Sequence, residues 1–211
     1  MTIDKKKLGI QILSLVGIII TIKLACIYYV ANFQQYALSS FCSINDFIDC
    51  DGAARSILAQ FWGIPLAYWG LFFYLTVLFL TFVDKLKNVR FLGFLNVFKN
   101  PMSYITFLGT IAFVVSMVLA GMSLFKINKL CILCLITYFL DLVIAMIAFG
   151  AKPKQFVQAM KDTFVDFIAG AKTYPKTFVI LLIMATSFLC YSGITDNFVP
   201  HIKKHKSIMK Y

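Results

Sequence analysis

The sequence contains no glutamate, and only 14% of its 211 residues are charged. Soluble domains carry about 25% charged residues, so this shortage argues against an ordinary cytosolic enzyme or a small secreted domain. It also argues against a disordered chain, because disordered segments are rich in charge and poor in apolar side chains. The chain has no internal repeat and no low-complexity tract.

Apolar residues are abundant instead, at 61% of the chain, with a mean hydropathy of +0.85. Five apolar stretches reach the length of about 20 residues that a bilayer crossing requires. Backbone polar groups inside a bilayer must pair within their own segment, and no stretch alternates like a barrel strand, so helices are expected. The sequence therefore predicts an all-α integral membrane protein with spans at 8–29, 62–83, 104–125, 130–149 and 178–199.

Positive charge dominates, with 20 Lys and Arg against 9 acidic residues and a net charge of +11. Nucleic-acid-binding proteins also carry such an excess, but they gather it on one surface. Here the cations lie between the apolar stretches, and the more basic side of a membrane protein is cytoplasmic. The N-terminus is therefore predicted to be cytoplasmic, while the side of the basic tail stays open. The cytoplasmic set would be Lys5, Lys6, Lys7, Lys85, Lys87, Arg90, Lys99, Lys152, Lys154, Lys161, Lys172 and Lys176; the outer set would be Arg55, Lys126, Lys129 and the tail lysines 203, 204, 206 and 210.

Cys131 and Cys134 form a Cys-x-x-Cys pair at the outer end of the fourth stretch. Their spacing places both sulfurs on one face of a helix, close enough to form a disulfide after a modest adjustment. The free N–H groups of a helix N-terminus favour a thiolate, and Lys126 and Lys129 add positive charge nearby. The pair is predicted to be redox-active at a depth that a lipid-soluble oxidant can reach, although two cysteines in a helix can also be mere packing residues.

Cys42 and Cys50 lie in the predicted outer loop, residues 32–61, and enclose seven residues. A loop of this length can close as a disulfide, which would persist on the oxidising side of the membrane. A purely stabilising disulfide is the plainer alternative, and a zinc site fits poorly because its ligands usually come closer together in sequence. Cys26 and Cys190, inside the first and fifth stretches, are predicted to be buried as small apolar residues.

Two aspartates stand at positions that predict specific roles. Asp51 is a candidate N-cap for a short helix over residues 53–60, whose Ile57 and Leu58 could cover the ends of the spans like a lid. Asp141 lies inside the fourth stretch, and an acid within a membrane is a functional candidate by default. Proton handling and a contact between helices are both open for Asp141.

The order and spacing of these residues resemble a known family. The pattern Cys42-x7-Cys50, then Ser56, then Trp62-Gly63-Ile64-Pro65, then Cys131-x2-Cys134-x3-Tyr138 is similar to the bacterial form of the vitamin K epoxide reductase family. The resemblance covers roughly two thirds of the chain. It implies a four-helix transmembrane bundle around a quinone pocket, to which the fifth apolar stretch adds another helix. The expected parts are a catalytic domain at 1–150, an interfacial linker at 151–177, the fifth span at 178–199 and a basic tail at 200–211.

The resemblance also assigns roles to the four outer cysteines. Cys131 and Cys134 would be the redox-active pair, with Cys134 deeper in the bilayer and facing the quinone. Cys50 would relay electrons between Cys42 and Cys131, and Cys42 would meet a partner protein.

Two more residues receive roles in the quinone pocket from the resemblance. Tyr138 lies one helical turn beyond Cys134 and would line the pocket. Ser56, in the lid, would help to hold it. Relatives often carry a polar pocket residue near Trp62, where this chain has an aromatic side chain.

The resemblance thus implies a thiol:quinone oxidoreductase of a bacterial inner membrane that uses ubiquinone or menaquinone and no metal. Bacterial members often carry a fused thioredoxin-like domain, and residues 200–211 are too short for one, so a separate thioredoxin-like (DsbA-type) protein is the expected partner. Reduction of vitamin K epoxide by a thiol donor and a disulfide-stapled scaffold without activity are the alternatives. Unrelated four-helix disulfide oxidases carry Cys-x-x-Cys in their first outer loop, and the order of the cysteines here argues against them.

Overall fold

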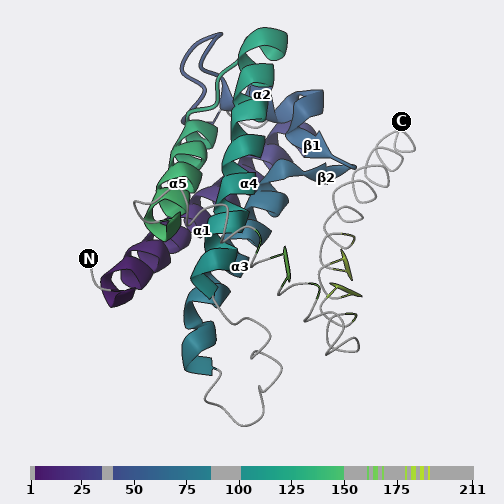
Figure 1. The fold of residues 1–211 in the computed structure, drawn as a ribbon. Coiled ribbons are helices and arrows are strands. Elements are labelled where there is room, and N and C mark those ends of the chain that lie inside the picture. The colour runs from purple at the N-terminus through teal and green to yellow at the C-terminus, as the bar shows by residue number, and fades with distance from the viewer. Residues whose placement is uncertain are drawn as a thin grey trace.

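The long helices form a bundle (Figure 1). A computed structural model describes residues 3–34, 40–86, 101–149 and isolated helical positions between 161 and 190. Three of the helices are long and apolar enough to cross a membrane, and the fourth is a shorter apolar helix. The prediction of an all-α membrane protein is confirmed. The helices are α1 (Ile3–Phe33), α3 (Leu66–Leu86), α4 (Pro101–Met122) and α5 (Ile132–Phe149).

The predicted linker at 151–177, the predicted fifth span at 178–199 and the tail at 200–211 lie outside the described residues, apart from the isolated helical positions. These three parts of the prediction therefore remain expectations.

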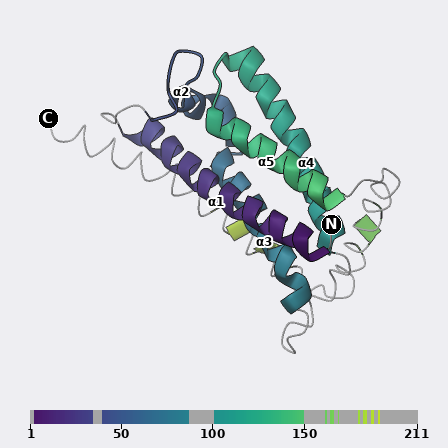
Figure 2. The ribbon, with the colours of Figure 1, turned by 90° about the vertical axis from the view of Figure 1, so that its left-hand side faces the viewer.

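The four helices close into a ring. Helix α1 packs against α3 and α5, and α4 packs against the same two helices. Figure 2 shows α1 and α5 running side by side along the face of the bundle that it presents. A ring of this kind encloses one shared interior, so side chains from all four helices can meet there.

The helix surfaces explain why the chain takes this form. The outward side of α1 exposes large apolar side chains that a membrane protein turns toward lipid, which is as apolar as its core. Its inward side carries small or polar residues at close contacts. A Cβ atom on Gly17 would lie 2.5 Å from the ring of Tyr74, so glycine is needed for α3 to approach α1. The exposed set on α1 includes Leu8, Ile12, Leu15, Ile19 and Ile22.

Short elements cover one end of the bundle between α1 and α3. They are α2 (Cys50–Arg55), a 3-10 turn (Ile57–Ala59) and the antiparallel strands β1 (Gln60–Phe61) and β2 (Ile64–Pro65). Trp62 and Gly63 form the strand connection with φ angles of 55° and 76°, as tight two-residue hairpins require.

Two expectations about this region are wrong. The second membrane helix begins at Leu66 and not at residue 62, because residues 62–65 belong to the hairpin that residues 60–65 form. The lid helix expected at 53–60 begins earlier and ends at Arg55.

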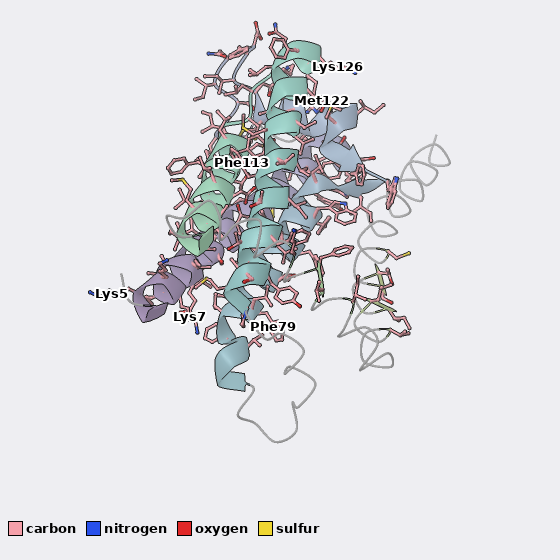
Figure 3. The ribbon with its side chains drawn as sticks, viewed as in Figure 1. Lys5, Lys7, Phe79, Phe113, Met122 and Lys126 are labelled. Atoms are coloured by element: carbon pink, nitrogen blue, oxygen red, sulfur yellow. A yellow bond between two sulfur atoms is a disulfide. The ribbon has the colours of Figure 1, made fainter. Side chains whose placement is uncertain are left out.

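The two ends of the bundle both carry lysines. Figure 3 shows Lys126 at the end of α4, and Lys5 and Lys7 at the opposite end of the molecule, on α1. Beyond α4 the chain forms a π-helical turn, Ser123–Ile127, and reverses at Asn128, which has a left-handed φ of 53°. The cysteine-bearing segments lie at the Lys126 end.

Candidate active site

The four outer cysteines gather at one place. Cys42 and Cys50 are joined as a disulfide with their Cα atoms 5.6 Å apart, and Cys131 and Cys134 are free thiols. Cys42, Cys50 and Cys131 belong to one buried cluster, with Cys134 packed against it. Cys42 is only 3% exposed and Cys131 only 5%. The fold therefore brings the disulfide Cys42–Cys50 into contact with the thiol pair Cys131 and Cys134, about 80 residues away in sequence. We call these four cysteines the contact group.

A short backbone pairing sets the outer loop against the start of α5. Ile48 and Leu130 form a parallel β-bridge. The N–H of Leu130 donates to the carbonyl of Phe47 at 2.7 Å, and the N–H of Asp49 donates to the carbonyl of Leu130 at 3.1 Å. Because Asp49 and Leu130 directly precede Cys50 and Cys131, this pairing fixes the register of the two cysteines.

Asp49 connects the same segments through its side chain. It is the N-cap of α2 and accepts a hydrogen bond from the N–H of Gly52 at 2.9 Å. It also accepts one from Ser43 Oγ at 2.8 Å and forms an ion pair with Lys129. Partial burial raises the pKa of Asp49, but the hydrogen bonds from Lys129, Gly52 and Ser43 outweigh burial and lower its pKa to about 2.

The expectation that Asp51 is the N-cap is wrong. Helix α2 begins at Cys50, so Asp49 caps it and Asp51 lies in its first turn. Asp51 holds the loop instead, because its carboxylate accepts from the N–H of Ser40 at 2.7 Å and its own N–H donates to Ser43 Oγ at 3.2 Å. Asp49 and Asp51 thus together hold the segment that contains the disulfide, and we call these two residues with Ser43 and Lys129 the clasp.

The Cys-x-x-Cys pair opens α5 as expected. The carbonyl of Cys131 accepts the N–H of Leu135 at 3.1 Å, and its Sγ accepts the N–H of Cys134 at 3.3 Å. Its sulfur therefore takes the place of an N-cap oxygen, and such a position favours a thiolate. Lys129 was expected to add positive charge beside the Cys-x-x-Cys pair. Its ammonium group forms an ion pair with Asp49 instead. Lys129 and Asp49 are far apart in the chain, so no local pattern indicates that ion pair.

A cavity of about 360 Å³ lies beside the thiols, inside the ring of helices. Its walls are mostly apolar, and Cys50, Cys131, Cys134 and Tyr138 all line it. Ser56 lines it as well, while its hydroxyl donates to the carbonyl of Ala53 at 2.6 Å and thereby ends α2. The site residues expected from the sequence thus share one cavity, except for Cys42, which is bonded to the lining residue Cys50. Leu58 and Ala59 of the 3-10 turn also line this space, as a lid would; Ile57 is 91% exposed.

Two further polar residues that the resemblance did not assign, Trp69 and Asp141, line the cavity. The indole Nε1 of Trp69 is buried and has no hydrogen-bond partner among the described residues. Asp141 lies deeper along α5 than Cys134 and is held by hydroxyls from α3 and α4. An aromatic side chain in an apolar run carries no sequence signal for such a role, whereas Asp141 was recognisable as an acid within a span.

The remaining two cysteines take no part in this group. Cys26 and Cys190 are free and exposed on the described surface, so the expectation that they are buried small residues is wrong. Cys26 lies on the membrane helix α1, where an exposed side chain faces lipid and a small apolar group is as well tolerated as in a core.

Comparison with known proteins agrees with this geometry. Residues 8–149 match the sequence model of the vitamin K epoxide reductase family, which is more than half of the chain. No curated protein matches the chain. In general terms the family implies a membrane oxidoreductase that works with thiol redox partners and a quinone. With its two cysteine pairs beside one cavity, the chain belongs to the vitamin K epoxide reductase family.

Proposed function

We propose that this protein oxidises a separate thioredoxin-like (DsbA-type) protein and passes the electrons to a quinone, thereby supplying disulfide bonds. The observation that carries the proposal is the contact group of a bonded pair, Cys42–Cys50, and a thiol pair, Cys131 and Cys134, beside an apolar cavity. Neighbouring disulfide and dithiol pairs can exchange through a mixed disulfide.

The proposed electron path has three steps. A thiolate of the partner attacks Cys42, breaks the Cys42–Cys50 bond and leaves Cys50 as a thiolate; the partner's second thiol then attacks that mixed disulfide and leaves as an oxidised pair. Cys50 next attacks Cys131 of an oxidised Cys131–Cys134 pair, and Cys42 resolves the new mixed disulfide. The regenerated dithiol finally gives two electrons and two protons to a quinone and becomes a disulfide again. A bonded outer pair with a free inner pair is the state that immediately precedes this last step.

The first step requires the outer loop to move. Cys42 is buried, and Ser43, Asp49 and Asp51 hold its segment closed. A partner thiol must approach the disulfide in line, so we propose that the loop opens for the partner and closes again over Cys131. Such opening is a local transition of a segment held by a few polar contacts, and it leaves the helices intact.

The chemistry of the cavity supports a quinone as acceptor. Ligand pockets are typically apolar with a few placed polar groups, and quinones present an apolar ring with two carbonyl acceptors. The buried N–H of Trp69 lacks an acceptor among the described residues, and an unpaired buried donor costs about 1–3 kcal/mol. A quinone carbonyl would satisfy it. Ubiquinone and menaquinone both meet this requirement.

We further propose that the cysteine end lies on the oxidising side of a bacterial inner membrane. Lys5 and Lys7 lie at the far end of the bundle, as expected for a cytoplasmic N-terminus (Figure 3). A disulfide in the outer loop is stable only in an oxidising compartment.

A thiol count tests the proposed function. The fully reduced protein in detergent is mixed with a soluble quinone, and free thiols are tagged with a maleimide over time. Four thiols should disappear in the wild type, while Cys26 and Cys190 stay reactive as internal references. In Cys134→Ala, Cys42 and Cys50 should stay reduced. The matched control Cys26→Ser should behave like the wild type. Quinone-driven oxidation of Cys42 and Cys50 in Cys134→Ala would contradict the path.

A further inference from the structure

The cavity contains one acidic side chain for which the electron path has no use. Among the lining residues that the structure describes, Asp141 alone carries a side chain that is charged at neutral pH. It is 6% exposed and lies within a membrane helix. An acid at such a depth is costly and is usually held by partners that serve a function.

The hydrogen bonds around Asp141 suit two protonation states. Tyr74 Oη lies 2.7 Å from Asp141 Oδ1 and 3.1 Å from the carbonyl oxygen of Thr137, while Ser116 Oγ donates to Asp141 Oδ2 at 2.9 Å. A tyrosine hydroxyl has one hydrogen, so it can donate to only one of its two neighbours at a time. When Asp141 is ionised, Tyr74 donates to it.

When Asp141 is protonated on Oδ1, the direction of this chain reverses. The carboxyl group then donates to Tyr74 Oη, and Tyr74 donates to the carbonyl of Thr137. Every group keeps a partner in both states, and no heavy atom has to move. The second acceptor is the backbone carbonyl of Thr137, one turn before Asp141 on α5.

We propose that Asp141 carries a proton between the Cys131–Cys134 dithiol and the quinone. The proposal rests on the proposed function. As the sulfurs form their bond, two S–H bonds break, two electrons go to the quinone, and two O–H bonds form on it. One of the two released protons passes to the Asp141 carboxylate and from there to a quinone oxygen. Asp141 ends each turnover as it began, so atoms and electrons balance without another reactant.

The surroundings contain few competing proton sites. Tyr74 faces Asp141 from α3, and Ser116, which does not titrate in this range, faces it from α4. On α5 itself, Cys134 and Tyr138 line the same cavity, and α1 contributes Tyr28 at its outer end. The thiols and the tyrosines are neutral at physiological pH in their ordinary states. Asp141 is therefore the one group there that is ordinarily ionised at physiological pH and so has a free site to take up a proton and give it back.

The test compares Asp141→Asn with the wild type in detergent. Asparagine keeps the shape and, like the protonated acid, can both donate and accept hydrogen bonds, but it cannot carry a proton. The rate at which a soluble quinone oxidises the Cys131–Cys134 dithiol should fall by about 100-fold or more, as for loss of a general acid–base group. The dissociation constant of the quinone should change little, and the acid limb of the rate–pH profile should vanish.

A second variant separates proton transfer from structure. Ser116→Ala removes one bond to the carboxylate but leaves its proton site, so it should lower thermal stability and keep the acid limb. An infrared difference spectrum between dithiol and disulfide forms, with ¹³C-labelled aspartate, should contain a carboxyl band that Asp141→Asn removes. If Asp141→Asn does not fold, Tyr74→Phe should alter that band and slow the oxidation.

The results of these experiments distinguish failure of the proton-carrier proposal from failure of the proposed function. A wild-type rate with a wild-type acid limb in Asp141→Asn, or in Tyr74→Phe where the first variant does not fold, overturns the proton-carrier proposal. A parallel loss of rate and melting temperature in Asp141→Asn and Ser116→Ala, with the acid limb kept, also overturns it, because the role is then structural. If quinone fails to oxidise the dithiol of the wild type, it is the proposed function that falls.

Discussion

The two halves of the helix bundle differ in how their interiors are filled. The half away from the cysteines is a packed apolar core, in which Ile10, Val77 and Ile144 have no exposed surface. The half beneath the outer loop contains the cavity of about 360 Å³, bordered by the sulfurs. The same four helices therefore enclose a packed core at one end and a cavity at the other. We call these the packed half and the hollow half.

This difference has an energetic meaning. Side chains that line an empty space lack contact partners, so a cavity lowers stability relative to a filled interior. The packed half has to hold the helices in place while the other half stays open to a ligand. Tyr74 and Asp141 lie where the two regions meet: Tyr74 belongs to the packed cluster, and both residues line the cavity.

The largest expected effect comes from opening the packed half. Ile144→Ala removes a fully buried side chain and should lower the free energy of unfolding by about 2–5 kcal/mol. Leu119→Ala, which widens the existing cavity, is the matched change in the hollow half and should cost clearly less. Denaturation in mild detergent measures both. Equal losses would mean that the two halves do not differ in packing.

A smaller effect is expected from the clasp that closes the hollow half. Asp49→Asn keeps an N-cap but removes the charge that pairs with Lys129. The closed loop should be weakened by about 0.5–1 kcal/mol, the upper range for a partly exposed ion pair. Hydrogen exchange at the amides of Asp49 and Leu130, which form the bridge to α5, should become faster. Asp46→Asn, at an exposed loop position, is the control and should change neither amide.

The same clasp predicts a pH dependence. The pKa of Asp49 is about 2 in the folded protein against an ordinary 3.8, so its charged form favours the closed loop. Its contribution is complete above pH 3.8 and is lost as the pH falls through about 2. The protection of the two amides should decrease over this interval in the wild type and in Asp46→Asn. A decrease of the same size in Asp49→Asn would assign it to another group.

Much of this arrangement can be predicted from the sequence. Long apolar runs specify the helices, and the spacing of Cys131 and Cys134 at a helix start identifies the inner thiol pair. The order of the two cysteine pairs and Tyr138 leads to the family. The apolar runs and the Cys-x-x-Cys pair are local features, and the order of the cysteine pairs can be read along the chain without knowing which segments touch.

The errors arise where a local pattern has two solutions or where partners lie far apart. The apolar residues Trp62 and Ile64 read as the start of a span, since hydropathy does not distinguish a hairpin over the helix ends from the helix itself. Asp49 and Asp51 are equally good caps on chemical grounds, and the bridge to Leu130 decides between them. That bridge joins segments about 80 residues apart and has no signature in either one.

The smallest expected effect comes from Trp69, which lines the cavity beside the hairpin. Trp69 borders the cavity, packs edge-on against Phe61 of the hairpin with ring centroids 6.1 Å apart, and has a buried N–H without an acceptor among the described residues. Trp69→Phe keeps an aromatic ring and removes only that donor. If the N–H meets a quinone carbonyl, losing a net 0.5–1.5 kcal/mol should raise the Kd of a soluble quinone by roughly 3- to 10-fold.

The chain offers a matched control for this measurement. It has two tryptophans, and Trp62 lies at the exposed tip of the hairpin, outside the cavity lining. Trp62→Phe should bind quinone with wild-type affinity and leaves Trp69 as the sole indole, whose fluorescence a bound quinone should quench. An unchanged Kd in Trp69→Phe, with quenching intact in Trp62→Phe, would mean that Trp69 lines the site without donating to the ligand. The hollow half would then recognise quinone by its shape and apolar surface, and its polar contacts would come from other lining residues such as Ser56, Tyr138 and Asp141.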